Sequence, residues 1–266
     1  MEFSTILFKK EEGIGTIILN RPEALNAIND IMIDELLKAF DEVAKDNDIR
    51  ALVITGVGKA FCSGAQMKGE GTGLRVMPDM GVEGIRQGLR QIQMVTSGLY
   101  HMAIPTIAML NGAAVGAGAS MAYSCDLRVG SDLAKFRCSF TKVGIIPCPG
   151  DTWLLPRIIG LAKAAEMIFT ADMIDAKEAE RIGLLNKLVK ADALEKETMD
   201  MARKIAQGPP IALKADKLIM HRGLQMDFDT TLEMLAAFGP TALTSEDVKE
   251  GILAFIEKRT PQFKGM

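Results

Sequence analysis

The residues best suited to chemistry are small and uncharged, and they lie between Leu110 and Asp126 in the stretch LNGAAVGAGASMAYSCD. Residues 104–110 predict a short buried strand, and the pair Asn111-Gly112 ends it. Residues 116–122 predict a helix whose first turn carries only small side chains. Free N–H groups at such a helix start can bind a ligand oxygen, and can stabilise negative charge that develops on it. A tightly packed strand–helix crossing, in which glycine only relieves crowding, explains the same residues.

A second turn of small residues, Ser63-Gly64-Ala65, follows the end of a strand predicted within residues 59–68 and leads toward a helix. The preceding GVGK at 56–59 lacks the Ser/Thr and the spacing of a phosphate-binding P-loop. The two small-residue turns are therefore the candidate functional elements.

Other segments must position these turns. Strands are expected at residues 13–19 and 51–55, with a helix at 30–45 that has Asp30 as its N-cap. The glycine-rich residues 69–88 predict a mobile loop, from which Asp79 and Glu83 could enter a closed site. A helix near 85–102 follows this loop.

The second half of the chain is mainly helical in pattern. A strand is expected at 126–130 and irregular structure at 136–152. The helices are expected at 153–159, 162–170, 176–182, 191–207, 211–222, 230–238 and 245–258, with Ser245 and Asp247 in the capping region of the last. We therefore expect an α/β protein with a core at residues 1–190 and a helical oligomerisation region at 191–266.

Composition narrows the class of protein. The chain has 266 residues, is 48% hydrophobic and carries a net charge of −3, without a basic stripe for nucleic acid. Residues 102–125 are uncharged but contain Pro, Asn-Gly and many small residues, so we expect no membrane span. The N-terminus does not resemble a signal peptide, and the four cysteines show no metal or disulfide spacing. With only two histidines, no metal site is expected, and we predict a reduced, cytoplasmic location.

The order and spacing of several segments resemble the crotonase (enoyl-CoA hydratase/isomerase) superfamily over nearly the whole chain. The matching segments are RPEALNAI at 21–28, KAFCSGAQMK at 59–68, IPTIAMLNGAAVGAGASMAYSCDLRV at 104–129, GIIP at 144–147, TWLLPRIIG at 152–160, IDAKEAERIGLLNKLV at 174–189 and FIEKRTPQFK at 255–264. The resemblance implies a crotonase-like ββα spiral core, a helical C-terminal trimerisation region, and a homotrimer or dimer of trimers.

The resemblance also assigns a use to the two turns. In this family two backbone N–H groups grip the thioester oxygen of an acyl-CoA and stabilise an enolate, and by position they belong here to Ala65 and Ala117. Because the donors belong to the main chain, only small residues are needed around them. The resemblance places coenzyme A against two stretches and one residue of the last helix: Ala24, Leu25 and Ala27; Ser63, Gly64, Ala65, Gln66, Met67 and Lys68, together with Gly116; and Lys258. Gln66 stands where relatives usually have Asp, and Lys258 is equally explained as a solvated lysine.

The resemblance fails at the acid–base groups. A hydratase of this family places glutamates at two positions, which are Ser120 and Phe140 here. Serine without an adjacent base is a poor proton reservoir, and phenylalanine carries no proton to exchange. Hydration by two glutamates, and isomerisation by a carboxylate at the second position, are therefore doubtful.

Other groups could take over. Cys148 stands where some relatives have a catalytic Asp, and it would be nucleophilic if its pKa were lowered, or inert if buried. Asp151 could turn its carboxylate toward the pocket or cap the following helix. Tyr123 is expected in the core and His101 at the surface. Trp153 and Phe140 could line an acyl pocket for an aromatic or alicyclic group, or simply pack.

The sequence thus favours an acyl-CoA enzyme with a backbone oxyanion hole and altered acid–base groups, acting as a lyase or isomerase. It requires no separate cofactor, because coenzyme A arrives with the substrate. The alternative is a non-catalytic acyl-CoA-binding or assembly subunit with the same fold.

Overall fold

The computed structural model describes residues 3–67 and 81–266 of the chain. Its larger sheet has six strands in the order β1-β2-β3-β5-β7-β10. These strands are β1 (Ile6–Glu11), β2 (Ile14–Leu19), β3 (Ala51–Gly56), β5 (Thr106–Leu110), β7 (Leu127–Ser131) and β10 (Lys187–Val189). β1 is antiparallel to β2, and every other neighbouring pair is parallel. β3 and β5 are buried along their whole length, as expected for central strands made of continuous apolar residues.

A smaller sheet holds the segments that carry the two turns. Its order is β4-β6-β8-β9, with β4 at Ala60–Cys62, β6 at Ala113–Val115, β8 at Lys135–Arg137 and β9 at Ile174–Asp175. β4 and β6 are parallel neighbours. Their carboxyl ends therefore lie at the same edge of the sheet, and the turns that follow them leave side by side.

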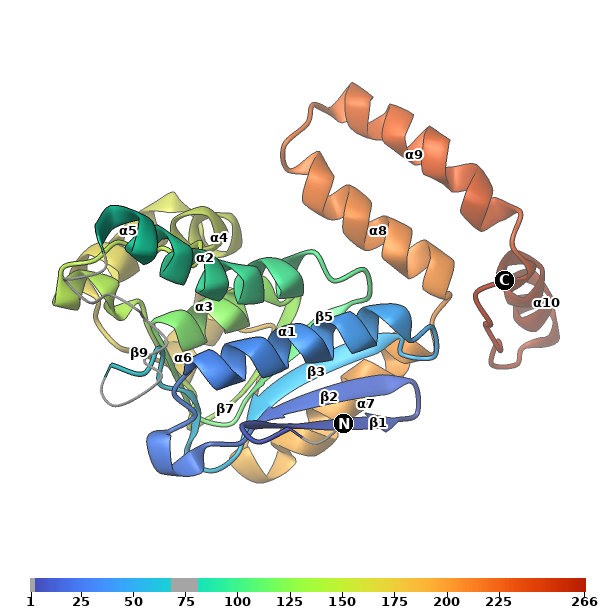
Figure 1. Ribbon diagram of the computed structural model, residues 1–266. Coiled ribbons are helices and arrows are strands. Elements are labelled where there is room, and N and C mark those ends of the chain that lie inside the picture. The colour runs from blue at the N-terminus through green and yellow to red at the C-terminus, as the bar shows by residue number, and fades with distance from the viewer. Residues whose placement is uncertain (1–2, 68–80) are drawn as a thin grey trace.

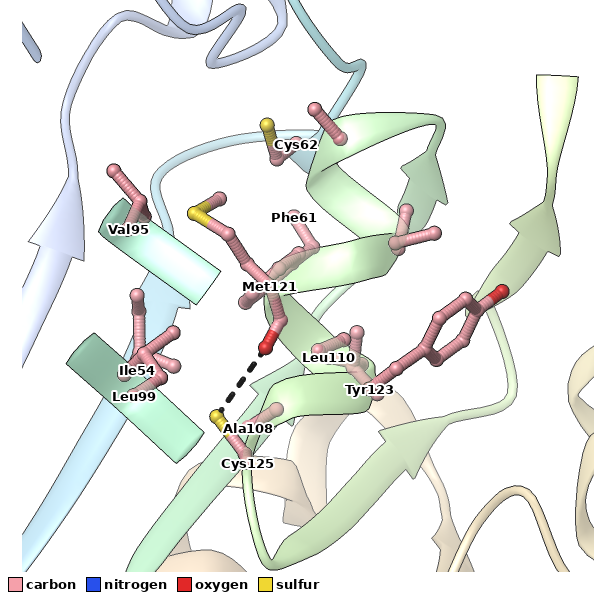
Figure 2. Close-up of a cluster of buried hydrophobic side chains, with 14 of the residues drawn as sticks. Ile54, Phe61, Cys62, Val95, Leu99, Ala108, Leu110, Met121, Tyr123 and Cys125 are labelled. Atoms are coloured by element: carbon pink, nitrogen blue, oxygen red, sulfur yellow. Dashed lines mark hydrogen bonds between the residues drawn. The ribbon is translucent and has the colours of Figure 1, made fainter. Parts of the chain in front are cut away.

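Helices cover both faces of the larger sheet (Figure 1). α1 (Asp30–Lys45), α2 (Gly81–Tyr100) and α3 (Ala117–Ser124) lie on one side, and α7 (Leu194–Ala206) packs against β2, β3, β5 and β7 on the other. α3 is buried along its entire length. In Figure 2, Met121 of α3 points toward Val95 and Leu99 of α2, whereas Tyr123 points to the opposite side. This packing holds the start of α3 in a fixed position.

The remaining helices lie before and after β9, and the last three form the C-terminal part. They are α4 (Asp151–Ile159), α5 (Leu161–Thr170), α6 (Ala176–Arg181), α8 (Pro210–Gly223), α9 (Phe228–Leu243) and α10 (Glu246–Glu257), with short 3-10 turns η1 (Pro22–Ala24), η3 (Ser139–Val143) and η4 (Ala191–Ala193). α8, α9 and α10 extend away from the sheets (Figure 1). Among the described residues, no helix combines the length and apolar character needed to cross a bilayer.

The α/β class and the helical C-terminal region agree with the sequence-based predictions, but several details differ. The N-cap of α1 is Asn29, not Asp30, because the Asn29 side chain accepts a hydrogen bond from the Met32 N–H. β1 was not predicted, because the lysines and glutamate of this edge strand interrupt the alternation of apolar and polar residues that indicates a strand. Helix α2 begins at Gly81, inside the predicted loop. Most of that loop, including Asp79, lies outside the described residues.

Candidate functional site

The two small-residue turns meet at the carboxyl edge of the smaller sheet. A Cβ atom placed on Gly64 would lie 2.8 Å from the Val115 carbonyl oxygen and 3.7 Å from the Ala117 nitrogen. Gly64 also has a φ of +101°, which favours glycine. Glycine at this position therefore lets the backbone of the first turn approach the start of α3.

Hydrogen bonds hold the first turn against the segment that the resemblance assigned to coenzyme A. The Ile28 N–H donates to the Gly64 carbonyl (2.8 Å), and the Gln66 N–H donates back to the Ile28 carbonyl (2.7 Å). The Ser63 N–H donates to the Leu25 carbonyl (3.0 Å). These bonds bring Ala24, Leu25 and Ala27 beside Ser63, Gly64, Ala65, Gln66 and Met67.

Two other predicted contact residues are Lys68 and Lys258. Lys68 lies outside the described residues. Lys258 follows α10, which is far from the turns within one chain (Figure 1).

Asn26 fixes the shape of this segment, and the sequence analysis did not single it out. Its buried side-chain amide donates to the carbonyls of Val57 and Ala60, both at 2.9 Å, and its Oδ1 accepts from the Arg21 N–H. Asn26 also has a φ of +57°, a conformation that asparagine tolerates better than most residues. The available signal was its place within RPEALNAI at 21–28, one of the segments that carry the family resemblance.

A cavity of about 110 Å³ lies between the turns. Ala65 and Ala117 both line it, together with Gly64, Gly116 and Phe140. Ala117 is the first residue of α3, so its N–H has no acceptor within the helix. Among the described residues, no backbone carbonyl accepts a hydrogen bond from the Ala65 N–H either. Two residues beside this cavity thus have main-chain N–H groups without a backbone acceptor in the described chain.

Ser120 and Phe140, the two positions to which the resemblance assigned glutamates, lie near this cavity. Ser120 is fully buried one turn after Ala117, and its hydroxyl donates to the Gly116 carbonyl (3.1 Å). Phe140 lines the cavity, and a Cβ on Gly116 would lie 4.0 Å from its ring. No carboxylate is among the described residues that line the cavity.

Cys148 lines the same cavity and is half-buried. Burial raises the pKa of its thiol, so the neutral form predominates at neutral pH. Helix α2 holds the turn that contains Cys148: the Gln93 amide donates to the Cys148 carbonyl (3.0 Å), and the Thr96 hydroxyl donates to the Pro149 carbonyl (2.8 Å). The sequence analysis did not identify these two anchoring residues, whose partners are more than 50 residues away in the chain.

Asp151 is fully buried next to these groups. Its Oδ2 accepts a hydrogen bond from the Cys138 thiol (3.3 Å), and its Oδ1 has no partner of ordinary geometry within the described part of the chain. Burial raises the pKa of Asp151 to about 7, although the nearby Ser120 hydroxyl and Cys138 thiol favour the ionised form. The N-cap of α4 is Gly150, so the helix-cap interpretation of Asp151 is wrong.

The other candidate residues from the sequence analysis have core or surface contacts that account for them without a catalytic role. Tyr123 is buried in the core, as expected, near Asp151 and Cys138. His101 is exposed and contacts Ser97 (3.2 Å). Glu83 forms an exposed ion pair with Arg86 in the first turns of α2. In residues 3–67 and 81–266, no three His, Cys, Asp or Glu side chains come together as a metal-binding group.

Comparisons with known proteins show the family to which the chain belongs. Residues 9–266 match the model of the family described as enoyl-CoA hydratase/isomerase. The chain belongs to this family. A short-chain-enoyl-CoA hydratase of Clostridium acetobutylicum is 37% identical over 97% of both chains, and a 1,2-epoxyphenylacetyl-CoA isomerase of Escherichia coli is 35% identical over 100% of this chain and 99% of the relative. The crystal structure of an enoyl-CoA hydratase from Bacillus anthracis matches with a TM-score of 0.93 and 32% identity, covering 99% of this chain and 100% of that one.

Membership of the enoyl-CoA hydratase/isomerase family, together with the crotonase fold, makes this chain an acyl-CoA enzyme of the hydratase/isomerase class. Phe140 places an aromatic ring beside the junction of the two turns.

Proposed function

We propose that the protein isomerises an acyl-CoA thioester through an enolate, with the N–H groups of Ala65 and Ala117 binding the thioester oxygen. The observation that carries this proposal is the meeting of the two turns around one cavity, with both N–H groups free of backbone acceptors in the described chain. Donors fixed before the reaction stabilise charge as it develops on an oxygen, without reorganising. Ala24, Leu25, Ala27 and residues 63–67 form the adjoining surface for coenzyme A.

Asp151 is the proposed proton-transferring group. In an acyl group with a β,γ double bond, it removes a proton from the α-carbon, and the electron pair enters a dienolate with its charge on the thioester oxygen. The proton returns at the γ-carbon, and the double bond shifts to the α,β position. A pKa of about 7 suits both steps at neutral pH. Asp151 does not itself line the cavity, so its carboxyl must turn toward it, which breaks the Cys138 contact at Oδ2 and changes the setting of the nearby Ser120 hydroxyl.

A single carboxyl favours isomerisation over hydration. Hydration needs one group to activate water and a second to deliver a proton, and Ser120 and Phe140 do not supply this pair. A relative that is 35% identical over the whole chain is named an isomerase, which is consistent with this choice. One observation favours the alternative of a non-catalytic acyl-CoA-binding subunit: no carboxylate lines the described walls of the cavity.

The test is exchange of the α-proton of butyryl-CoA in D₂O, followed by mass spectrometry, with binding measured by calorimetry on the same sample. We expect exchange by the unmodified protein and a loss of about 100-fold or more in Asp151→Asn, with binding retained. Asp132→Asn, which changes an exposed aspartate, is the matched control and should leave exchange unchanged. Binding without exchange would support the non-catalytic subunit, and absence of binding would exclude both functions. Rapid hydration of crotonyl-CoA would contradict the choice of isomerisation.

A further inference from the structure

A second cavity lies beyond the one between the two turns. It has a volume of about 370 Å³ and is lined by α2, α4 and the turn before α4. The two cavities share Cys148 and Pro149 as a common wall. The first cavity, at about 110 Å³, is well below the roughly 300 Å³ at which small-molecule sites usually begin, whereas the second lies within their range. Bound at Ala65 and Ala117, a thioester with a bulky acyl group would need the second space.

The wall between the cavities is held in place. Gln93 and Thr96 bond to the carbonyls of Cys148 and Pro149, and Thr96 is buried. The main chain of the shared wall is therefore fixed by α2, and Cys148 belongs to the lining of both cavities.

Aromatic rings form the far side of the second cavity. Tyr100 and Trp153 meet edge to face with ring centroids 5.3 Å apart, and the Arg157 guanidinium lies 3.8 Å from the Trp153 ring centre. Tyr100 in turn stacks on His221 at 4.4 Å. Leu154 and Pro149 add further apolar surface. These contacts hold the rings in place, so the cavity keeps its shape.

The charge of the lining restricts the ligand. Among the described residues that line the second cavity, none is Asp, Glu, Lys or Arg. A charged acyl terminus would meet no Asp, Glu, Lys or Arg side chain of opposite charge there. A rigid neutral ring would contact the aromatic walls and lose less conformational freedom on binding than a flexible chain of the same carbon number.

We propose that the second cavity binds the distal part of the acyl group, and that the substrate class is an acyl-CoA with a neutral ring in its acyl part. This inference rests on the proposed function, because it places the thioester at Ala65 and Ala117. Trp153 allows a direct test, since it is the single tryptophan of the chain and lines this cavity.

The experiment compares three saturated esters: butyryl-CoA, octanoyl-CoA and cyclohexylacetyl-CoA, the last two having equal numbers of acyl carbons. We expect all three to bind, cyclohexylacetyl-CoA about tenfold more tightly than octanoyl-CoA. Only the esters with the larger acyl groups should change Trp153 emission. Equal affinity for cyclohexylacetyl-CoA and octanoyl-CoA would contradict the proposal that the substrate carries a ring. Unchanged Trp153 emission with every ester would contradict binding of the acyl group in the second cavity.

A variant that fills the cavity gives an independent check. Ser97 lines the cavity from the exposed side of α2, so Ser97→Phe should fold and occupy the space. We expect it to weaken cyclohexylacetyl-CoA at least tenfold while butyryl-CoA binds as before. Met94→Phe is the control, because Met94 is exposed on the same helix and is not among the residues lining either cavity. If none of the three esters binds to the unmodified protein, the proposed function itself is wrong.

Discussion

At the scale of single residues, Asp151 carries an energetic cost that follows from its burial. A carboxyl group without solvent favours its neutral form, and here only the Ser120 hydroxyl and the Cys138 thiol oppose that preference. The same position could therefore store a proton for catalysis and destabilise the folded chain once that proton is lost. Stability and proton transfer at this residue depend on the same pKa.

The pH dependence of stability tests this directly. With a folded pKa of about 7, against an ordinary value of 3.8, the folded chain retains the Asp151 proton where the unfolded chain has lost it. Its contribution to stability is thus fully present below about pH 4 and is lost as the pH rises to about 7. Asp151→Asn removes the ionisation, so it should raise the free energy of unfolding at pH 8 by on the order of a few kcal/mol, with little gain at pH 4.

Urea denaturation of both proteins at the two pH values measures this difference. Asp132→Asn serves as the control, because that carboxylate is exposed and paired with Lys190, and it should give no gain at pH 8. An equal effect of Asp151→Asn at both pH values would show that ionisation of Asp151 is not penalised in the folded state.

At the scale of secondary-structure elements, α2 links the region around residue 80 to the turn that precedes α4. One face of α2 packs on the core through Ile92, Val95 and Leu99, and Thr96 on the same helix reaches the Pro149 carbonyl. The position of Asp151, two residues farther along, therefore depends on α2 as well as on α4.

Thr96→Val keeps the shape of the side chain and removes the hydrogen bond. The buried Pro149 carbonyl loses its hydroxyl partner, and we expect the free energy of unfolding to fall by about 1–3 kcal/mol. α-Proton exchange should fall further than the change in butyryl-CoA affinity accounts for, because the thioester contacts are made by other turns. Thr170→Val is the matched control, since the Thr170 hydroxyl donates to the Glu166 carbonyl at an exposed site of α5. If both variants lose exchange equally, the Thr96 bond has no special role.

At the scale of the whole molecule, the C-terminal helices are only partly supported by their own chain. α8 is joined to the core through the buried Lys217, whose ammonium group donates to Asp126 (2.7 Å) and to the Ile104 carbonyl (3.0 Å), while His221 contacts the other oxygen of Asp126 (3.2 Å). α9, in contrast, has no buried residue among its 16. Phe228, Leu232 and Leu235 are exposed at helical spacing along it. An apolar helix face of this kind is typical of a protein–protein contact.

The family resemblance predicts a trimer, or a dimer of trimers, in solution, and we expect the exposed apolar face of α9 to contribute to the contact. Leu235→Asp places a charge on the exposed apolar face and should shift the mass measured by light scattering toward that of one chain. Glu233→Gln, on the same helix, should leave the mass unchanged. A single-chain mass for the unmodified protein would contradict the prediction, as would an unaltered mass for Leu235→Asp.

The sequence by itself determined the elements whose patterns are local. The run of apolar residues at 51–55 predicted β3, the helical spacing at 30–45 predicted α1, and the small residues at 63–65 and 116–122 identified the two turns. Main-chain donors need only small neighbouring residues, so these turns can be recognised from the local sequence without knowledge of any distant contact. The tertiary structure alone decided that Asn29 caps α1 and that Asn26 and Thr96 anchor distant carbonyls. It also decided that the Asp151 carboxyl faces Cys138 instead of capping α4, and that a second cavity lies behind Cys148. Side-chain direction and cavity shape result from packing between segments far apart in the chain, and local patterns carry no record of that packing.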